Sequence, residues 1–491
     1  MSLSVVEPST GSVSNLVDLF QRQREAFRLR PMPDHKTRIR RLDLLHNAIL
    51  DYRSRLIGAV SEDFSNRSGA ETDLTEIMAV LDGIAYYRKR LRKLMKPQKR
   101  HVPLTLAPAS VEVRFQPVGV VGIVVPWNFP IFLALSPLVG ALAAGNRAML
   151  KTSEFAPRTG ALMQTMIADI FKEDEVAVVT GDVEVATEFT QLPFDHLVFT
   201  GSTQVGKIVM HAAAENLTPV TLELGGKSPV IIHNEFPIEE AARRIAFGKG
   251  INAGQVCVSP DYILCPRTKV KTFCDAFVET IEKSYPTLRD NHDFTAIIND
   301  RQKGRLDGYL HDAAGKGAEL ISINPRSEDL SGTRKLPMTI VLHANDDMKV
   351  MQDEIFGPIL PIIPYDSLEE AIEYVNDRPR PLALYYFDWD KDRANRVLAR
   401  THSGGVGIND TMTQVMADDA PFGGVGPSGM GHYHGEEGFK TFSKAKTVVR
   451  KGRINSSSFI APPWNNFMFR ELMKLQAFRF RRRRIDGRAI D

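Results

Sequence analysis

Between residues 118 and 232 the sequence alternates short β-rich runs with longer segments of helical periodicity. The first run, Val118 to Val125, is apolar nearly throughout, as a strand covered by helices on both faces of a sheet must be. Further runs of this kind follow at Arg147 to Leu150, Val176 to Val179, His196 to Phe199 and Val220 to Leu222. Such a rhythm is typical of a doubly wound parallel sheet, so we predict an α/β fold.

The alternation continues after Glu223 and predicts a second parallel-sheet domain. Strand-like segments at 229–232 and 262–264 alternate with helical patterns at 238–247 and 269–284. The region before Pro103 is mainly helical.

Residues 111–115 alternate as a strand outside the two main sheets would. We expect this strand to pair with one near 446–450 in an arm that can add an edge to a partner's sheet.

These patterns divide the chain into four parts. We expect a Rossmann-like dinucleotide-binding domain over residues 1–223, with 103–117 contributing to the oligomerisation arm, and a catalytic domain over 224–417. Residues 418–450 would return the chain and supply the second arm strand, and 451–491 would form a C-terminal tail.

The composition restricts the partners of the chain. Its 491 residues are 43% hydrophobic and 25% charged, as in a soluble globular protein of two or three domains. The net charge of +3 is too small to indicate a nucleic-acid partner. Its 3 cysteines fit neither a disulfide framework nor a zinc site, so we expect no metal. With no secretory signal pattern at the N-terminus, a cytoplasmic location is expected.

Two basic clusters stand out from this background. The cluster at 88–93 lies among apolar residues at helical spacing, which indicates a solvated helix face. The run Arg481 to Arg484 follows apolar residues whose spacing would also suit a membrane surface. Because that segment is short and has no lipidation signal, a solvated tail is favoured over membrane association.

Cys257 and Glu223 supply the residue types that acyl-enzyme chemistry needs. A thiolate is a strong nucleophile, and a carboxylate in a glycine-flanked turn can act as the base that releases a covalent adduct. The other cysteines, Cys265 and Cys274, lie in strand-like and helical segments and are interpreted as core residues.

Two turns after predicted strands could face a ligand. In the first, Asn128 lies in a proline-bounded turn, where its amide could donate to an oxyanion or simply stabilise the turn. In the second, Gly201 to Gly206 lie between a strand and a helix, where backbone N–H groups and the helix dipole can bind phosphate. This segment lacks the Gly-x-Gly-x-x-Gly fingerprint, so a simple capped turn is the alternative.

An ordered set of segments resembles the NAD(P)-dependent aldehyde dehydrogenases. The set consists of Pro126 to Pro130, Lys151 to Glu154, Gly201 to Gly206, Glu223 to Pro229, Gly254 to Cys257 and Glu354 to Pro358. Each segment is modest alone, but their order is specific and spans residues 104–446. Within that superfamily the chain is similar to the class 3 branch, particularly the bacterial coniferyl aldehyde dehydrogenases.

The resemblance implies a role for each matching residue. Cys257 would attack the aldehyde, the Asn128 side chain and the Cys257 N–H would hold the thiohemiacetal oxyanion, and Glu223 would activate the water that hydrolyses the thioester. The implied cofactor-binding residues are Trp127, Lys151, Glu154, Gly201, Ser202, Val205, Glu354 and Phe356. A carboxylate near the ribose, as implied for Glu154, favours NAD, and NADP is left open.

The function that follows is oxidation of an aromatic, coniferyl-type or long-chain aldehyde to its acid by a homodimer. A CoA-acylating dehydrogenase is the alternative, although acylating relatives commonly lack the carboxylate found here as Glu223. A catalytically silent binding protein on the same scaffold is a third hypothesis, which the joint presence of Asn128, Glu223 and Cys257 disfavours.

Overall fold

The computed structural model describes residues 13–103, 106–453, 461–464 and 466–480. The chain divides into two units, which are described separately. The larger comprises Met1–Leu94 with Pro117–Ser443, and the smaller comprises Met95–Gln116 with Lys444–Asp491.

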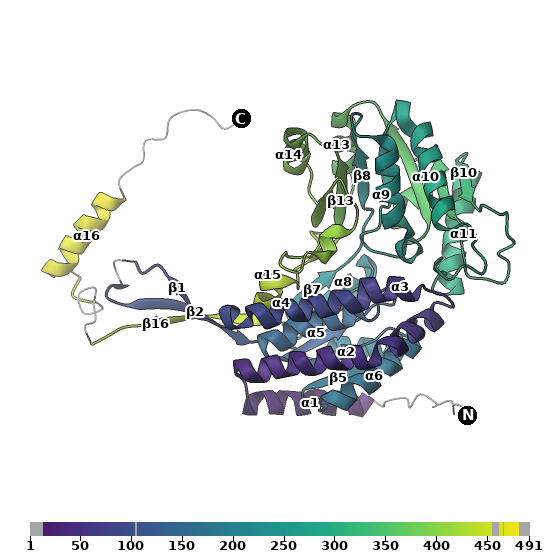
Figure 1. The fold of residues 1–491 in the computed structure, drawn as a ribbon. Helices are drawn as coiled ribbons and strands as arrows, with labels where there is room; N and C mark the ends of the chain where they lie inside the picture. Colours follow the sequence, from purple (N-terminus) through teal and green to yellow (C-terminus); the bar gives the residue numbers. More distant parts are fainter. Residues whose placement is uncertain (1–12, 104–105, 454–460, 465, 481–491) are drawn as a thin grey trace, which may run out of the picture. The chain divides into compact units, whose positions relative to one another are not determined.

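The larger unit contains a six-stranded sheet whose main strands are parallel, as predicted (Figure 1). Across the sheet the order is β15 (Gly429–Met430), β7 (Val220–Glu223), β6 (His196–Thr200), β3 (Val120–Val124), β4 (Arg147–Lys151) and β5 (Val176–Val179). The edge strand β15 pairs antiparallel with β7. The sequence did not predict β15, because a strand of two residues shows no periodicity.

Helices cover both faces of this sheet. The strands are almost wholly buried and mostly apolar, so both faces need such cover. The connecting helices are α5 (Phe132–Ala144), α6 (Pro157–Ile170), α7 (Val183–Gln191) and α8 (Thr203–Ala214). Two N-terminal helices complete the layers: α2 (His35–Asp63) packs on α5 and α6, and α1 (Val13–Leu29) packs on α7, β3 and β4. The helix α5 is almost wholly buried and ends where Gly145 takes a left-handed conformation, φ 98°.

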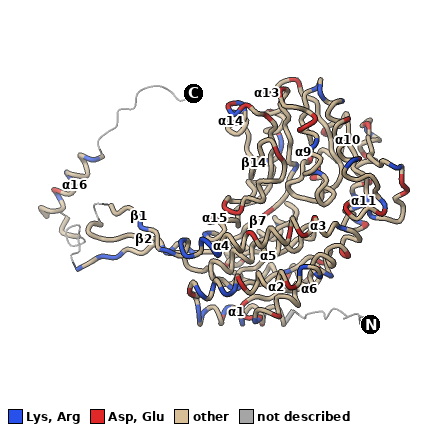
Figure 2. The backbone as a smooth tube through the Cα atoms, viewed as in Figure 1, with Lys and Arg blue, Asp and Glu red and all other residues tan. Residues whose placement is uncertain are grey.

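A third helical segment links the N-terminal helices to the rest of the unit. It runs from α3 (Gly69–Thr72) through the π-helix η1 (Asp73–Met78) into α4 (Ala79–Leu94). The last turns of α4 carry the basic cluster at 88–93, visible as blue backbone in Figure 2. Leu91 and Leu94 are buried between these mostly exposed charges, so the predicted solvated helix face is confirmed.

The second predicted sheet is also present in the larger unit, with seven strands. Their order is β10 (Glu319–Ile323), β11 (Met338–Leu342), β12 (Ile359–Tyr365), β9 (Tyr262–Pro266), β8 (Pro229–Ile232), β13 (Ala383–Phe387) and β14 (Gly405–Ile408). All neighbours pair in parallel except β10, which is antiparallel to β11.

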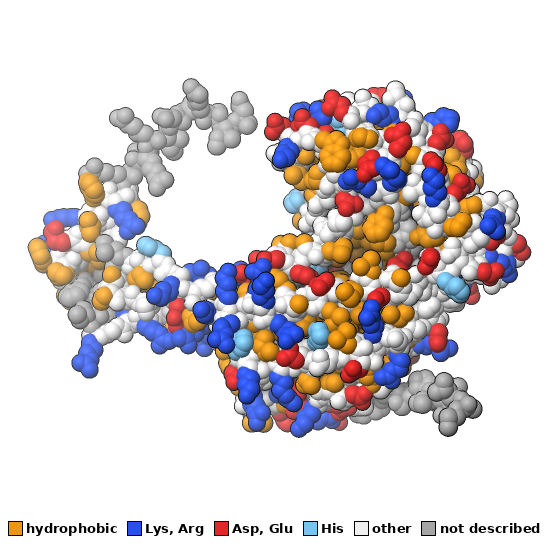
Figure 3. Space-filling model, in the orientation of Figure 1, with side chains coloured by type: hydrophobic (Ala, Val, Ile, Leu, Met, Phe, Trp, Pro, Cys, Tyr) orange, Lys and Arg blue, Asp and Glu red, His pale blue; other side chains and the backbone are white. Residues whose placement is uncertain are grey.

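Six longer or connecting helices and several short ones surround this second sheet. They are α9 (Ile238–Gly250), α10 (Val270–Ser284), α11 (Asp300–Gly315), α12 (Lys349–Gln352), α13 (Leu368–Asn376) and α14 (Lys391–Arg400), with η3 (Ile251–Gly254), η4 (Arg267–Lys269) and η5 (Thr413–Met416). The short helix α15 (Gly435–Thr441) instead packs on α4 and α5. Acidic and basic side chains are interspersed over the face of this unit seen in Figure 3.

The smaller unit contains a three-stranded sheet in the order β1 (Gln98–Arg100), β2 (Ser110–Pro117) and β16 (Ser443–Arg450). This sheet joins the two segments predicted to form the arm. Its strands are largely exposed, and β16 forms one edge. The role of the arm in oligomerisation stays a prediction, as do the residue boundaries predicted for the domains.

The smaller unit also contains α16 (Phe467–Arg479), whose apolar side chains include the exposed Phe467, Met468 and Leu475. The arginine run at 481–484, on which the tail prediction depended, lies outside the described residues. Across the part of the chain that the structure describes, none of the helices combines the length and apolar character needed to span a bilayer.

Candidate active site

A cavity of about 460 Å³ lies at the carboxyl ends of β3, β6 and β7. In parallel α/β sheets this edge is where ligands bind, because strand ends and helix N-termini meet there. Its lining residues come from the turns after these strands, from the Cys257 loop, from α11 and from the segment after α12. They are Pro126, Trp127, Asn128, Thr200, Gly201, Ser202, Gln204, Glu223, Leu224, Gly225, Cys257, Arg301, Gln302, Arg305, Tyr309, Glu354 and Phe356.

The cavity therefore brings together all three predicted catalytic residues, Cys257, Glu223 and Asn128. It also brings in five of the predicted cofactor residues: Trp127, Gly201, Ser202, Glu354 and Phe356. Of the remaining three, Val205 lines a second cavity, whereas Lys151 and Glu154 line neither of these two.

The loop before Cys257 has an unusual backbone. Asn252, Ala253 and Gly254 are consecutive residues with positive φ, at 50°, 49° and 73°. For residues with a side chain this conformation is unfavourable and persists only where the surroundings hold it. The buried Gln255 contributes by donating from Nε2 to the carbonyls of Asn252 and Ala296, at 2.9 and 3.1 Å.

The thiol of Cys257 lies in an environment that disfavours its charged form. Burial is the main cause of its raised pKa, and the negative charges of Glu354 and Glu223 raise it further. Backbone N–H groups of Cys257 and Val258 act in the opposite direction. Because the thiolate is the reactive form, the thiol needs a base or an added positive charge to react.

Glu223 ends β7 and is 2% exposed. Among the described residues nothing donates a hydrogen bond to either of its carboxylate oxygens. Burial raises the pKa of this carboxyl well above its ordinary value, because desolvation disfavours the anion. A buried acid with a raised pKa beside a nucleophile is typical of a general base tuned toward neutral pH.

Glu354 is a second buried acid in the cavity. Burial, followed by the charge of Asp261, raises its pKa to about 8, while an N–H of Gly226 favours the anion. Its carboxylate occupies the space that a Cβ on Gly225 would need, so a larger residue there would displace the carboxylate. Its Oε1 accepts no hydrogen bond from the described residues.

The loop of Glu354 is held from two sides. Arg305 on α11 donates to the carbonyls of Glu354 and Ile355, at 3.2 and 2.7 Å. Asp261 accepts from the N–H of Ile355 at 2.9 Å. Phe356, with φ 51°, makes a T-shaped contact with Trp127, with the ring centroids 5.3 Å apart.

Asn128 is 3% exposed and donates from Nδ2 to the carbonyl of Gln255 at 3.2 Å. This bond links the turn after β3 to the loop of Cys257. A side-chain amide has two N–H donors, so the Gln255 carbonyl accounts for one of them.

Ser202 caps α8, because its hydroxyl accepts from the N–H of Val205 at 3.3 Å. The predicted cap is therefore present, and phosphate binding at residues 201–206 stays a prediction. Since Ser202 also lines the cavity, the positive end of the α8 dipole lies at the cavity wall.

The ammonium of Lys151 already has hydrogen-bond partners within the protein. It is 1% exposed, and its ammonium donates to the carbonyls of Thr152 and Gly181, both at 2.8 Å. Burial lowers its pKa. Glu154, three residues later, is exposed.

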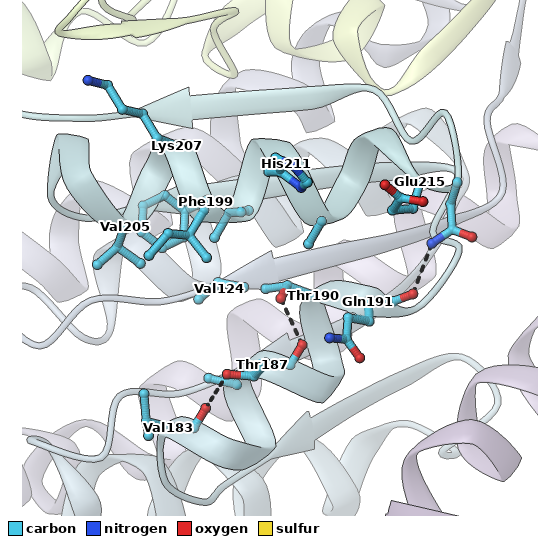
Figure 4. A pocket seen from close by; sticks show the side chains of 15 residues that line it. Val124, Val183, Thr187, Thr190, Gln191, Phe199, Val205, Lys207, His211 and Glu215 are labelled. Atoms are coloured by element: carbon cyan, nitrogen blue, oxygen red, sulfur yellow. Dashed lines mark hydrogen bonds between the residues drawn. The ribbon is translucent and has the colours of Figure 1, made fainter.

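A second cavity, of about 830 Å³, lies along α7 and α8 (Figure 4). Figure 4 shows Val183, Phe199 and Val205 around this space. Of its lining residues, only Val205 was predicted from the sequence. The apolar residues at 205, 208, 209 and 212 on α8 could have indicated this cavity, but a helix that faces a core shows the same spacing.

The comparisons with known proteins agree with this geometry. The model of the aldehyde dehydrogenase family matches residues 5–448. The chain belongs to the aldehyde dehydrogenase family. Enzymes of this family oxidise aldehydes to acids, and the comparisons give the CoA-acylating alternative no support.

Curated relatives place the enzyme near the predicted branch. It is 55% identical to a probable coniferyl aldehyde dehydrogenase of Pseudomonas aeruginosa, over 96% of this chain and 98% of that protein. It is 48% identical to a coniferyl aldehyde dehydrogenase of Pseudomonas sp., over 86% and 88%. It is also 39% identical to aldehyde dehydrogenase family 3 member A2 of Mus musculus, over 88% and 87%. The predicted class 3 resemblance is thus confirmed.

Solved structures support the fold. A substrate-bound AldH of Staphylococcus aureus has a TM-score of 0.88 at 36% identity, covering 94% of this chain and 99% of that one. An aldehyde dehydrogenase of Mycobacterium tuberculosis complexed with NAD+ has a TM-score of 0.81 at 28% identity, covering 91% of this chain and 92% of that one.

The other two cysteines, Cys265 and Cys274, were interpreted as core residues. They are 0% and 5% exposed, which confirms that interpretation.

Proposed function

We propose that this enzyme oxidises aldehydes through a thioester on Cys257. The observation that supports this most strongly is that Cys257, Glu223 and Asn128, which come from three separate segments of the chain, line one cavity. A nucleophile, a base and an oxyanion donor within one enclosed space are the groups that acyl-enzyme chemistry requires.

In the first half of the reaction the Cys257 thiol gives its proton to water, and the sulfur forms a bond to the aldehyde carbon. The carbonyl oxygen becomes an oxyanion, which the free N–H of the Asn128 side chain and the N–H of Cys257 stabilise. Such preorganised donors can contribute about 3 to 4 kcal/mol to the transition state. Bound NAD would supply the acceptor for the hydride that the tetrahedral carbon must lose.

In the second half Glu223 takes a proton from water, whose oxygen attacks the thioester carbon. The C–S bond breaks, the acid leaves and the sulfur regains a proton. Because Glu223 is a base only when ionised, its raised pKa places the onset of this step well above the ordinary carboxyl range.

The residues around the site fit a dinucleotide. The apolar cavity along α7 and α8 suits a planar heterocycle, and the N-terminus of α8 at Ser202 suits a pyrophosphate. The unpartnered Oε1 of Glu354 suits a ribose hydroxyl, beside the rings of Trp127 and Phe356.

The preferred dinucleotide is proposed to be NAD. We place Lys151 and Glu154 near the adenosine ribose, as the resemblance implies. The exposed carboxylate of Glu154 would accept from free ribose hydroxyls and repel a 2′-phosphate. NADP as a second cofactor is left to be tested by comparing kcat/KM for the two.

The substrate is proposed to be an aromatic, coniferyl-type aldehyde, with long-chain aldehydes as the second class. The names of the two Pseudomonas relatives support this proposal. Comparing kcat/KM for coniferaldehyde, benzaldehyde and a series of aliphatic aldehydes tests it, and a preference for short aliphatic aldehydes would contradict it.

We further propose that the enzyme is a cytoplasmic homodimer. The exposed edge of β16 in the arm sheet is the feature that supports pairing with a second chain. A mass in solution equal to one chain would contradict the dimer, and fractionation with the membranes would contradict the location.

Replacement of the thiol tests the role of Cys257. Cys257→Ala should abolish aldehyde-dependent NADH formation, because no other group in the cavity can form the thioester. Cys274→Ala is the matched control, because Cys274 is a residue of α10 and does not line the cavity. This variant should keep its activity within about twofold of the wild type. Undiminished turnover in Cys257→Ala would refute the proposed chemistry.

A further inference from the structure

Three charged side chains, Arg67, Glu71 and Glu76, form a buried cluster beside the candidate active site. Arg67 is 1% exposed and Glu76 is 0% exposed. The guanidinium donates from Nη1 to Glu76 Oε1 at 2.9 Å and from Nε to Glu71 Oε1 at 3.1 Å. Because burying charges costs desolvation free energy, such a cluster contributes little net stability, and stability alone does not account for it.

The cluster holds the turn that carries Asn128. Arg67 Nη1 donates to the carbonyl of Asn128 at 3.0 Å. Glu76 Oε2 accepts from the N–H groups of Ile131 and Phe132, at 2.7 and 3.1 Å. These N–H groups begin α5 and have no partner within the helix, and the helix dipole favours an anion there.

The same cluster holds the loop before Cys257. Glu71 Oε1 also accepts from the N–H of Asn252 at 3.0 Å. Asn252 Nδ2 in turn donates to the carbonyls of Asn128 and Gln255, at 3.0 and 3.1 Å. The left-handed backbone at Asn252 needs such contacts to persist.

A segment outside both loops therefore connects them. It comprises Arg67, α3 and the π-helix η1, which carries Glu76. π-Helical turns are rare and are found frequently at functional sites. None of the three charged residues lines the cavity itself.

We propose that Arg67, Glu71 and Glu76 are positioning residues that fix the Cys257 thiol relative to the oxyanion donor Asn128. This inference rests on the roles proposed above for Cys257 and Asn128. The attacking sulfur and the oxyanion donor reach the reacting carbon from different loops, so a shift of either loop misaligns them. A misplacement of about 1 Å can lower a rate about 100-fold.

Glu71 offers the sharpest test, because one oxygen accepts both of its hydrogen bonds. Glu71→Gln keeps an oxygen at that place and should keep kcat within about threefold of the wild type. Glu71→Asp keeps the charge but is one methylene shorter, and Glu71→Ala removes the acceptor. Both should lower kcat about 10- to 100-fold while the KM for NAD stays within about twofold.

Thermal unfolding checks that each variant is folded. If Glu71→Ala does not fold, the kcat values of Glu71→Gln and Glu71→Asp alone test the positioning role. Wild-type kcat in Glu71→Asp, or a loss in Glu71→Gln as large as that in Glu71→Asp, would overturn the positioning role. Cys257→Ala is assayed in parallel. Activity in Cys257→Ala would contradict the proposed function, whereas an inactive Cys257→Ala with a fully active Glu71→Asp would contradict only the positioning inference.

Discussion

At the scale of single residues, the site is governed by burial. Burial is the main cause of the raised pKa of Cys257, Glu223 and Glu354, and little hydrogen bonding offsets it at the two carboxylates. Burial therefore favours the neutral forms of all three groups. Two ionised carboxylates would disfavour the thiolate further, so binding of a cationic or hydrogen-bonding ligand near them promotes the reactive state.

The raised pKa of Glu354 predicts a pH-dependent stability. Between about pH 4.5 and pH 8 the folded chain retains a proton that the unfolded chain has released, so the free energy of unfolding falls as pH rises through this window. Glu354→Gln removes this contribution. Denaturant unfolding without cofactor should therefore show a smaller loss of stability from pH 5 to pH 8 in the variant, and equal losses in both proteins would contradict the assignment.

The sequence could predict some site residues and not others for a physical reason. Cys257 and Asn128 lie in turns close to glycine or proline, and Glu223 ends β7 just before Gly225, so packing alone does not explain these side chains. Arg67 and Glu71 lie among other polar residues of a helical region, where a charge usually faces solvent. Arg67 and Glu71 are largely buried because two loops distant in the sequence pack against them, and the local sequence around these residues does not show that packing.

At the scale of elements, α8 shows how one helix serves two sites. Its N-terminus lies at the catalytic cavity, and its apolar stripe lines the cavity along α7. The stripe predicted a helix correctly, but Ile208 on it is 63% exposed. Whether a stripe faces a core or a cavity depends on α7, a separate segment, so the sequence of α8 alone could not decide it.

The stripe predicts a specific loss of cofactor affinity. Ile208→Asp places a charge in the cavity along α7 and α8, which is proposed to hold a planar heterocycle of the dinucleotide, and should raise the KM for NAD about tenfold. Because the side chain is already mostly exposed, the thermal midpoint should change little. Met210→Asp is the control, since Met210 is 45% exposed on the same helix but does not line the cavity. Equal KM values for the two variants would contradict the cofactor position.

At the scale of the whole chain, periodicity predicted both parallel sheets because strands buried on two faces are apolar throughout. In the second sheet it predicted β8 and β9 but not β11, β12, β13 and β14, and it missed the antiparallel edge strands of both sheets. β10 is only partly buried, and β15 consists of two residues paired with β7. The cavity itself could not be predicted from one segment, because its lining comes from both sheet regions and from α11.

The central claim is that acyl transfer proceeds through Cys257 and is completed by Glu223. Its most direct test is mass spectrometry of Glu223→Gln after mixing with benzaldehyde and NAD, because removal of the base should leave the acyl group on the enzyme. The account predicts a benzoyl adduct on the peptide that contains Cys257, and none when Cys257→Ala is added to the variant. An adduct on another residue, or rapid turnover without any adduct, would contradict it.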